Sequence, residues 1–304
     1  MSSQVDFVAG TLARYGPAGP QVALLAGAAQ DGIPTRALVL VGGLTDGLLF
    51  APYAALLSEE VTRHMPGWLV AHASLQSSWQ GYGTGSLDRD ADDLHLLSRF
   101  LKRRFGVAGW VLMGHSTGCQ DAARFMQRFP PGGSPQEDGA DGGAEPELLG
   151  TILQAPVSDH EWLLGYPELA PLAERARELV SEARGDEVVG RLHVADNAPI
   201  TAARFLSLYD LGGDDDMFSE GLSEGVRQDL LAPVGARPCL LLVSGADECC
   251  PKMSEISDRA AALQRAIGAS ASIHVVAGAP HNLAGHEVEA MAVLRSFLAG
   301  LPSP

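Results

Sequence analysis

The stretch from Trp110 to Asp121 constrains the fold of this chain more than any other. It reads Trp-Val-Leu-Met-Gly-His-Ser-Thr-Gly-Cys-Gln-Asp, an apolar strand pattern that runs through Gly-His-Ser-Thr-Gly into an amphipathic helix. A G-x-S-x-G sequence in this setting is typical of a nucleophile elbow, a sharp turn that exposes a serine hydroxyl. Gly114 and Gly118 remove the Cβ atoms that would collide where the helix packs back on the strand. The stretch therefore predicts Ser116 as a nucleophile.

Strand and helix patterns alternate along most of the chain. Residues 36–41 are a continuous apolar run, as expected of a strand that is buried on both faces of a parallel sheet. The expected strands are 22–28, 36–41, 68–75, 110–113, 149–155, 239–244 and 272–276. The expected helices are 52–64, 87–105, the elbow helix ending at Phe129, 253–267 and 286–299. This alternation predicts an α/β fold with a mostly parallel sheet flanked by helices.

Two segments depart from the alternation. Residues 159–233 look mostly helical, with amphipathic stretches at 168–183 and near 199–209, and we expect them to form a cap inserted into a single domain that spans 1–304. Residues 131–147 are acidic and low in complexity, so they cannot bury enough apolar surface to order themselves. We expect a flexible, solvated loop there.

The composition argues against two classes of partner. The chain has 37 acidic and 21 basic residues and a formal net charge of −16, whereas a nucleic-acid-binding protein needs a basic surface. No stretch is long and apolar enough to span a bilayer, and the N-terminus lacks the pattern of a signal peptide. We therefore expect a small-molecule partner, no nucleic acid and no membrane, and the sequence leaves the oligomeric state open.

The cysteines and the glycine-rich loops indicate neither a disulfide scaffold nor a cofactor. The four cysteines, at positions 119, 239, 249 and 250, are too few and too unevenly placed for such a scaffold, which favours a reducing, cytoplasmic setting. They also lack metal-ligand spacing. Residues 79–85 nearly match G-x-G-x-x-G, but the last spacing is wrong for a dinucleotide site. We expect no metal and no cofactor.

His281 is the predicted base. A serine nucleophile needs a base, which an acid orients, and in α/β-hydrolases the three follow in the order serine, acid, histidine. His281 lies a few residues beyond the strand expected at 272–276, in a Gly/Pro loop downstream of every other candidate position. The other histidines precede the serine, adjoin it, lie in a strand, open a helix or fall in or near the expected cap: His64, His72, His95, His115, His274, His286, His160 and His193.

Asp247 is the predicted acid. It follows the strand expected at 239–244, in the loop from which the third member of the triad should project. Two alternatives remain open at this point. Glu248 is the adjacent carboxylate, and Asp159 follows the preceding strand.

Backbone N–H groups are expected to stabilise the tetrahedral intermediate. One donor is the residue after the nucleophile, Thr117, and the other lies in the loop after strand 36–41, where Leu44 is the first choice and Gly43 the second. Trp79 and Tyr82 are expected to form aromatic walls of the substrate pocket, with His115 packed beside the serine.

Several stretches together resemble the α/β-hydrolase family that includes the fungal fusarinine C esterase, which hydrolyses siderophore esters. The extended elbow, Gly-His-Ser-Thr-Gly-Cys-Gln-Asp, is much more specific than G-x-S-x-G alone. The stretches that carry the resemblance are 42–49, 81–87, 114–121, 153–159, 244–248 and 280–282. The resemblance implies the same triad, Ser116, Asp247 and His281, and an ester bond as the target. Residues 131–147 and the cap depart from it, so the siderophore specificity does not carry over.

These features predict a serine hydrolase that cleaves carboxylic esters through an acyl-enzyme intermediate. The alternative is a small-molecule receptor or an interaction protein that uses a hydrolase scaffold without hydrolysis, because a fold does not fix a function.

Overall fold

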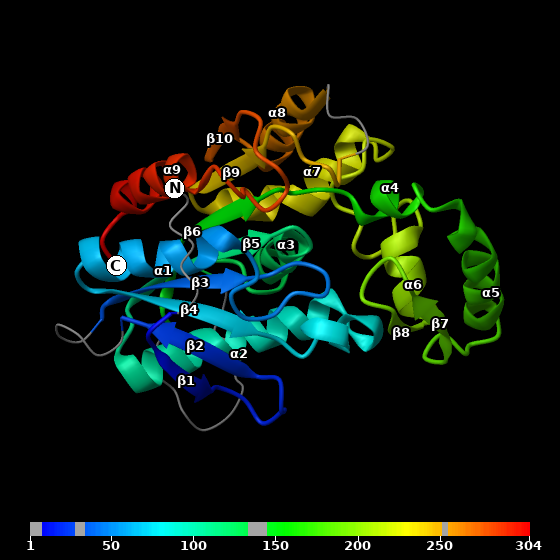
Figure 1. The fold of residues 1–304 in the computed structure, drawn as a ribbon, viewed down its shortest axis with the longest axis horizontal. Helices are drawn as coiled ribbons and strands as arrows, with labels where there is room; N and C mark the ends of the chain where they lie inside the picture. Colours follow the sequence, from blue (N-terminus) through cyan, green and yellow to red (C-terminus); the bar gives the residue numbers. More distant parts are fainter. Residues whose placement is uncertain (1–7, 28–33, 133–144, 251–254) are drawn as a thin grey trace.

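A single sheet organises the protein, with its strands in the order β1-β2-β4-β3-β5-β6-β9-β10 (Figure 1). The structure is a computed structural model, and it describes residues 8–27, 34–132, 145–250 and 255–304. β1 pairs antiparallel with β2, as β2 does with β4, and the remaining pairs are parallel. The strands are β1 (Thr11–Arg14), β2 (Val22–Ala26), β3 (Arg36–Val41), β4 (Trp68–Ser74), β5 (Gly109–His115), β6 (Glu147–Gln154), β9 (Cys239–Ser244) and β10 (Ala271–Val276). The mostly parallel sheet predicted from the alternation is confirmed.

Successive side chains of the central strands belong alternately to two separate hydrophobic clusters. In β3, Ala37, Val39 and Val41 join one cluster, whereas Leu38 and Leu40 join the other. This is the two-residue period of a strand with apolar side chains on both faces. The continuous apolar run at 36–41 therefore reflects burial on both sides.

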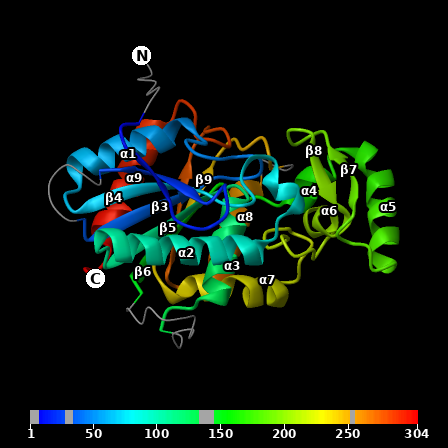
Figure 2. The same cartoon turned by 90° about the horizontal axis from the view of Figure 1, so that it is seen from below.

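Helices cover both faces of the sheet. Figure 2 shows α1 and α9 on one face and α2, α3 and α7 on the other. The helices are α1 (Pro52–His64), α2 (Leu87–Phe105), α3 (Gly118–Arg128), α7 (Glu224–Leu231), α8 (Ile256–Ile267) and α9 (Glu287–Gly300). α2 begins where the Ser86 side chain accepts from the Arg89 N–H, and it ends at Gly106 in the left-handed conformation. In the described part of the chain, no helix has both the length and the apolarity to cross a bilayer.

Residues 159–209 form a smaller layer with a hydrophobic cluster of its own, beyond one end of the sheet (Figure 1). It contains α4 (Asp159–Leu163), η2 (Pro167–Leu169), α5 (Ala170–Ser181), β7 (Val188–Leu192), β8 (Ala198–Thr201) and α6 (Ala202–Tyr209). The sequence predicts a mostly helical segment, whereas the structure also contains the antiparallel pair β7–β8. By contrast, α7 and η3 (Ala232–Ala236) pack on α3 and α8 of the main body, although they lie within the range proposed for the cap.

A short helical turn, η1 (Trp79–Thr84), attaches this layer to the sheet domain. The Tyr82 hydroxyl donates to the Ala195 carbonyl at 2.7 Å, and Arg204 Nε donates to the Tyr82 carbonyl at 3.0 Å. A Cβ atom on Gly83 would lie 1.9 Å from the Pro199 carbonyl oxygen. Glycine at this position therefore lets the two backbones touch.

The turn between β5 and α3 has the backbone expected of the elbow. Ser116 has a φ of 54°, a left-handed conformation that costs a residue with a side chain about 1–2 kcal/mol. A Cβ on Gly114 would lie 2.1 Å from the Gly118 carbonyl oxygen, and one on Gly118 would lie 2.6 Å from the Gly42 carbonyl oxygen. Both glycines are thus required by close backbone approach.

Gly114→Ala is expected to lower the free energy of unfolding by more than about 2 kcal/mol, because the added methyl group meets backbone that cannot move independently. The measurement is urea denaturation followed by circular dichroism. Gly225→Ala is the matched control, since nothing lies within 4 Å of a Cβ at that helical position. The control should be unchanged or more stable by about 0.5–1 kcal/mol. Equal destabilisation of the two variants would contradict this interpretation of the elbow.

Candidate active site

Ser116 lies at the end of β5 on the strained elbow, and it is partly exposed. Its N–H donates to the Gln154 carbonyl at 3.0 Å, which ties the turn to the end of β6. Its hydroxyl makes no hydrogen bond with the described residues. Hydrogen bonds between a nucleophile and its base are often long without substrate and tighten when substrate binds.

His281 and Asp247 form a close pair on the loops that follow β10 and β9. His281 Nδ1 lies 2.8 Å and 2.9 Å from the two carboxylate oxygens of Asp247. Of the two alternative acids, Glu248 accepts from the His281 backbone N–H at 2.8 Å, and Asp159 accepts from Gln120 at 2.7 Å. Asp247 is therefore the carboxylate in contact with the imidazole ring.

The surroundings of His281 favour its protonated form. Burial disfavours the charged ring, but hydrogen bonds to Asp247 and Cys249 and the charge of Asp247 outweigh burial and raise the pKa of His281 to about 10. A carboxylate in this position stabilises the imidazolium that forms when a histidine takes a proton from serine.

Two free backbone donors lie close to the serine. A Cβ on Gly43 would be 2.6 Å from Ser116 Cβ, so the loop after β3 lies against the nucleophile. The Gly43 N–H donates to Asp46 Oδ2 at 2.7 Å. The N–H groups of Leu44 and Thr117 make no hydrogen bond within the described part of the chain. Of the three predicted oxyanion donors, Gly43 is thus engaged in its own turn, whereas Leu44 and Thr117 are available.

Two residues that the sequence analysis did not assign to the site organise it. Asp46 holds the turn that presents Leu44. Gln154, fully buried at the end of β6, donates to Ser244 Oγ and to the His281 carbonyl at 3.2 Å and 3.1 Å. In the sequence, Gln154 lies in one of the stretches that resemble a known family, but that resemblance assigns it no role.

His115 is buried and packs against His281. Its ring centroid is 4.9 Å from that of His281, and it stacks on Phe50. Its Nδ1 donates to the Gln154 side-chain oxygen. Burial, together with the charge of His281, lowers the pKa of His115 to about 3, so its ring is neutral. His115 therefore supports the position of His281.

The two predicted aromatic walls have different environments. Trp79 is 55% exposed, with its ring against Gly47, and its backbone N–H donates to the Asp46 carbonyl at 2.9 Å. Tyr82 is buried and lines a cavity together with Leu44 and Thr117. Of the two, only Tyr82 lines this cavity.

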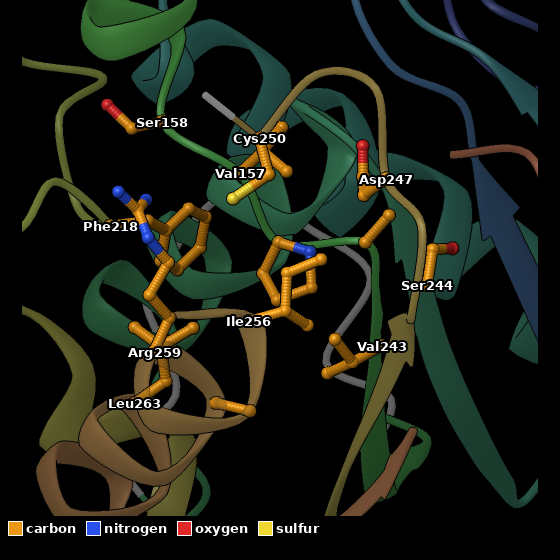
Figure 3. A pocket seen from close by; sticks show the side chains of 13 residues that line it. Val157, Ser158, Phe218, Val243, Ser244, Asp247, Cys250, Ile256, Arg259 and Leu263 are labelled. Carbon is orange, nitrogen blue, oxygen red and sulfur yellow. The ribbon is translucent and has the colours of Figure 1, made fainter. Parts of the chain in front are cut away.

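A second cavity, mostly apolar, lies on the Asp247 side of the site. Figure 3 shows Asp247 and Ser244 at one edge and Phe218 and Arg259 across from them. Arg259 is neutralised by Glu161 and Glu220, at 2.6 Å and 3.0 Å. The side chains that make the cavity apolar are Val157, Phe218, Val243, Ile256 and Leu263.

Asp247, Cys249 and His281 are the one group of described residues that could hold a metal ion, with their potential ligand atoms within 4.8 Å of one another. An ion there would occupy the carboxylate and the imidazole of the acid–base pair. It would therefore compete with proton transfer. All four cysteines are free thiols.

Comparisons with known proteins agree with this architecture. The model of the family described as "protein of unknown function (DUF1749)" matches residues 2–299. The UPF0613 protein PB24D3.06c of Schizosaccharomyces pombe is 32% identical over 276 residues, which are 82% of this chain and 81% of that protein. Fusarinine C esterase sidJ of Aspergillus fumigatus is 31% identical over 259 residues, 71% of this chain and 72% of that protein.

Solved structures share the whole fold. The siderophore hydrolase EstB from Aspergillus fumigatus has a TM-score of 0.76 at 25% identity and covers 97% of this chain and 98% of its own. An α/β-hydrolase fold protein of unknown function has a TM-score of 0.64 at 21% identity, covering 97% of each chain. The chain belongs to the DUF1749 family of α/β-hydrolase-fold proteins, whose relatives include the fusarinine C esterase sidJ.

Proposed function

We propose that the chain is a serine hydrolase of carboxylic esters, with Ser116 as nucleophile, His281 as base and Asp247 as the orienting acid. The observation that carries the proposal is the His281–Asp247 pair at 2.8 Å, on loops beside an elbow that exposes Ser116. The relatives named as esterases support an ester as the bond that is cleaved. The expected substrate is a small-molecule ester.

Acylation transfers the acyl group of the ester to Ser116 and releases the alcohol. Neutral His281 accepts the proton of Ser116 Oγ at Nε2 while Oγ bonds to the ester carbonyl carbon. The carbonyl oxygen becomes an oxyanion and accepts hydrogen bonds from the Leu44 and Thr117 N–H groups. The C–O bond to the alcohol then breaks, and the alcohol takes the proton from His281.

Deacylation repeats these steps with water. His281 takes a proton from a water molecule, which adds to the acyl carbonyl, and the ester bond to Ser116 breaks. The proton returns to Oγ and the free acid leaves. Asp247 stays ionised throughout, because its role is to hold Nδ1–H and to stabilise the imidazolium.

Ser116→Ala is expected to lower the rate of hydrolysis of 4-nitrophenyl esters of varied acyl length by about 10³-fold or more. The same loss is expected for fusarinine C if wild type hydrolyses it. Labelling by a fluorophosphonate should disappear with it, because both reactions need Oγ. Ser181→Ala, at an exposed serine of α5, is the matched control and should react like wild type. Equal labelling of the Ser116 variant and wild type would refute the proposal.

Asp247→Asn is expected to lower kcat/KM by roughly 10³- to 10⁴-fold and to move its acid limb to lower pH. Asp247 raises the pKa of His281, which reaches about 10, and the base acts only when neutral. Loss of the carboxylate charge lowers that pKa, so the neutral form persists at lower pH. The measurement is kcat/KM across pH 5–10.

Glu248→Gln is the matched control, because the Glu248 carboxylate accepts from the backbone N–H of His281, whereas Asp247 contacts the ring. Its pH profile should stay near that of wild type. A larger loss for Glu248→Gln than for Asp247→Asn would instead assign Glu248 as the acid.

A further inference from the structure

The cavity beside the two free N–H groups is lined by charged residues from both the sheet domain and the segment after β8. Leu44 and Thr117 lie on its wall, with Asp90 of α2, Asp121 of α3, and Arg204 and Asp215 from the segment after β8. It therefore adjoins the position where the reacting carbonyl would lie. The mechanism proposed above uses none of these four charged side chains.

The charges in this cavity do not balance. Three carboxylates face one guanidinium, and all four side chains belong to buried residues. Arg204 is already engaged, by Asp215 Oδ2, by Ser207 Oγ at 3.0 Å and by the Tyr82 carbonyl at 3.0 Å. Asp90 and Asp121 thus lack an ionic partner of their own in the described part of the chain.

Two carboxylate oxygens on the cavity wall have no hydrogen-bond partner among the described residues. Asp90 Oδ1, Asp215 Oδ1 and Thr117 Oγ1 are buried and have no hydrogen-bond partner in the described structure. A hydroxyl can donate as well as accept, but the two carboxylate oxygens can only accept unless they are protonated. Leaving such groups buried and unpaired costs about 1–3 kcal/mol each. A positively charged donor would pair with both of these carboxylate oxygens.

The pKa values of two of these carboxyls, Asp90 and Asp121, are raised. Burial raises the pKa of Asp90 to about 6, although Ser77 and Arg204 oppose the shift. Burial, and then the charges of Asp90 and Asp215, raise the pKa of Asp121 well above its usual range. Burial therefore disfavours the charged form of both carboxyls.

We propose that this cavity binds a primary ammonium group carried by the ester substrate, close to its reacting carbonyl. The inference rests on the proposed esterase function and specifies its substrate class. The cavity volume of about 20 Å³ admits a group the size of a water molecule, which fits –NH₃⁺ and excludes a trimethylammonium group. The carboxylates do not converge as metal ligands do, since among described residues only Asp247, Cys249 and His281 form such a group.

Matched esters test the inference on either side of the ester bond. The 4-nitrophenyl esters of 3-aminopropanoate and butanoate differ only in –NH₃⁺ against –CH₃ on the acyl side. 3-Aminopropyl and butyl acetate do the same on the alcohol side. We expect kcat/KM at pH 7 to favour the ammonium ester about tenfold or more in one pair, as for a charged hydrogen bond. No preference in either pair overturns the inference while leaving the esterase proposal intact.

Asp90→Asn should lower that preference about tenfold, with the folding of the variant checked by circular dichroism. Asp92→Asn, on the same helix with a 53% exposed side chain, is the matched control and should keep the preference. An unchanged preference in the Asp90 variant overturns the inference.

Binding provides a readout that does not depend on turnover. Calorimetry on wild type compares 3-aminopropanamide with butanamide, neither of which is an ester. Tighter binding of the amine that Asp90→Asn removes supports the inference. Equal or weaker binding of the amine overturns it, whether or not any ester is hydrolysed.

Discussion

The buried amide of Gln154 is the interaction on which the candidate site depends. Its backbone carbonyl accepts from Ser116, its side-chain oxygen accepts from His115 and from the Tyr53 hydroxyl, and its side-chain nitrogen donates to Ser244 and to the His281 carbonyl. One fully buried side chain thereby joins the ends of β5, β6 and β9 and the loop after β10. Because a buried amide left unpaired is costly, these bonds hold the serine and histidine segments in one register.

The segment after β8 contributes charged side chains to the surroundings of the candidate site. Arg204 and Asp215 belong to the chain that follows β8, yet they line the cavity that reaches Leu44 and Thr117. Arg204 also bonds to the Tyr82 carbonyl, so the same side chain joins the layer to the sheet domain. A change in how this layer packs would therefore alter the electrostatic field at the carbonyl position.

Much of the sheet domain follows from local patterns. The sequence pattern predicts β3 and α1 at the observed residues. A strand that is apolar on both faces is a strong signal, and so is a helix with proline at its first position. Chain order and strand ends also single out Asp247 and His281, which prove to be in contact. The β7–β8 pair escapes prediction because Val188–Leu192 and Ala198–Thr201 are short and lack regular alternation. Gln154 and the carboxylates of the cavity beside Leu44 and Thr117 escape it because their roles arise only from neighbours far away in the chain.

The left-handed conformation of Ser116 has a consequence beyond catalysis. The residue holds a φ of 54° only while β5, α3 and the Gln154 carbonyl are packed around it. In the unfolded chain this serine relaxes to ordinary backbone angles and loses the elbow geometry on which its proposed reactivity depends. Covalent labelling of the hydroxyl would thus count native molecules in a mixture, so one chemical tag can monitor folding, ligand stabilisation and ageing of the protein in crude samples.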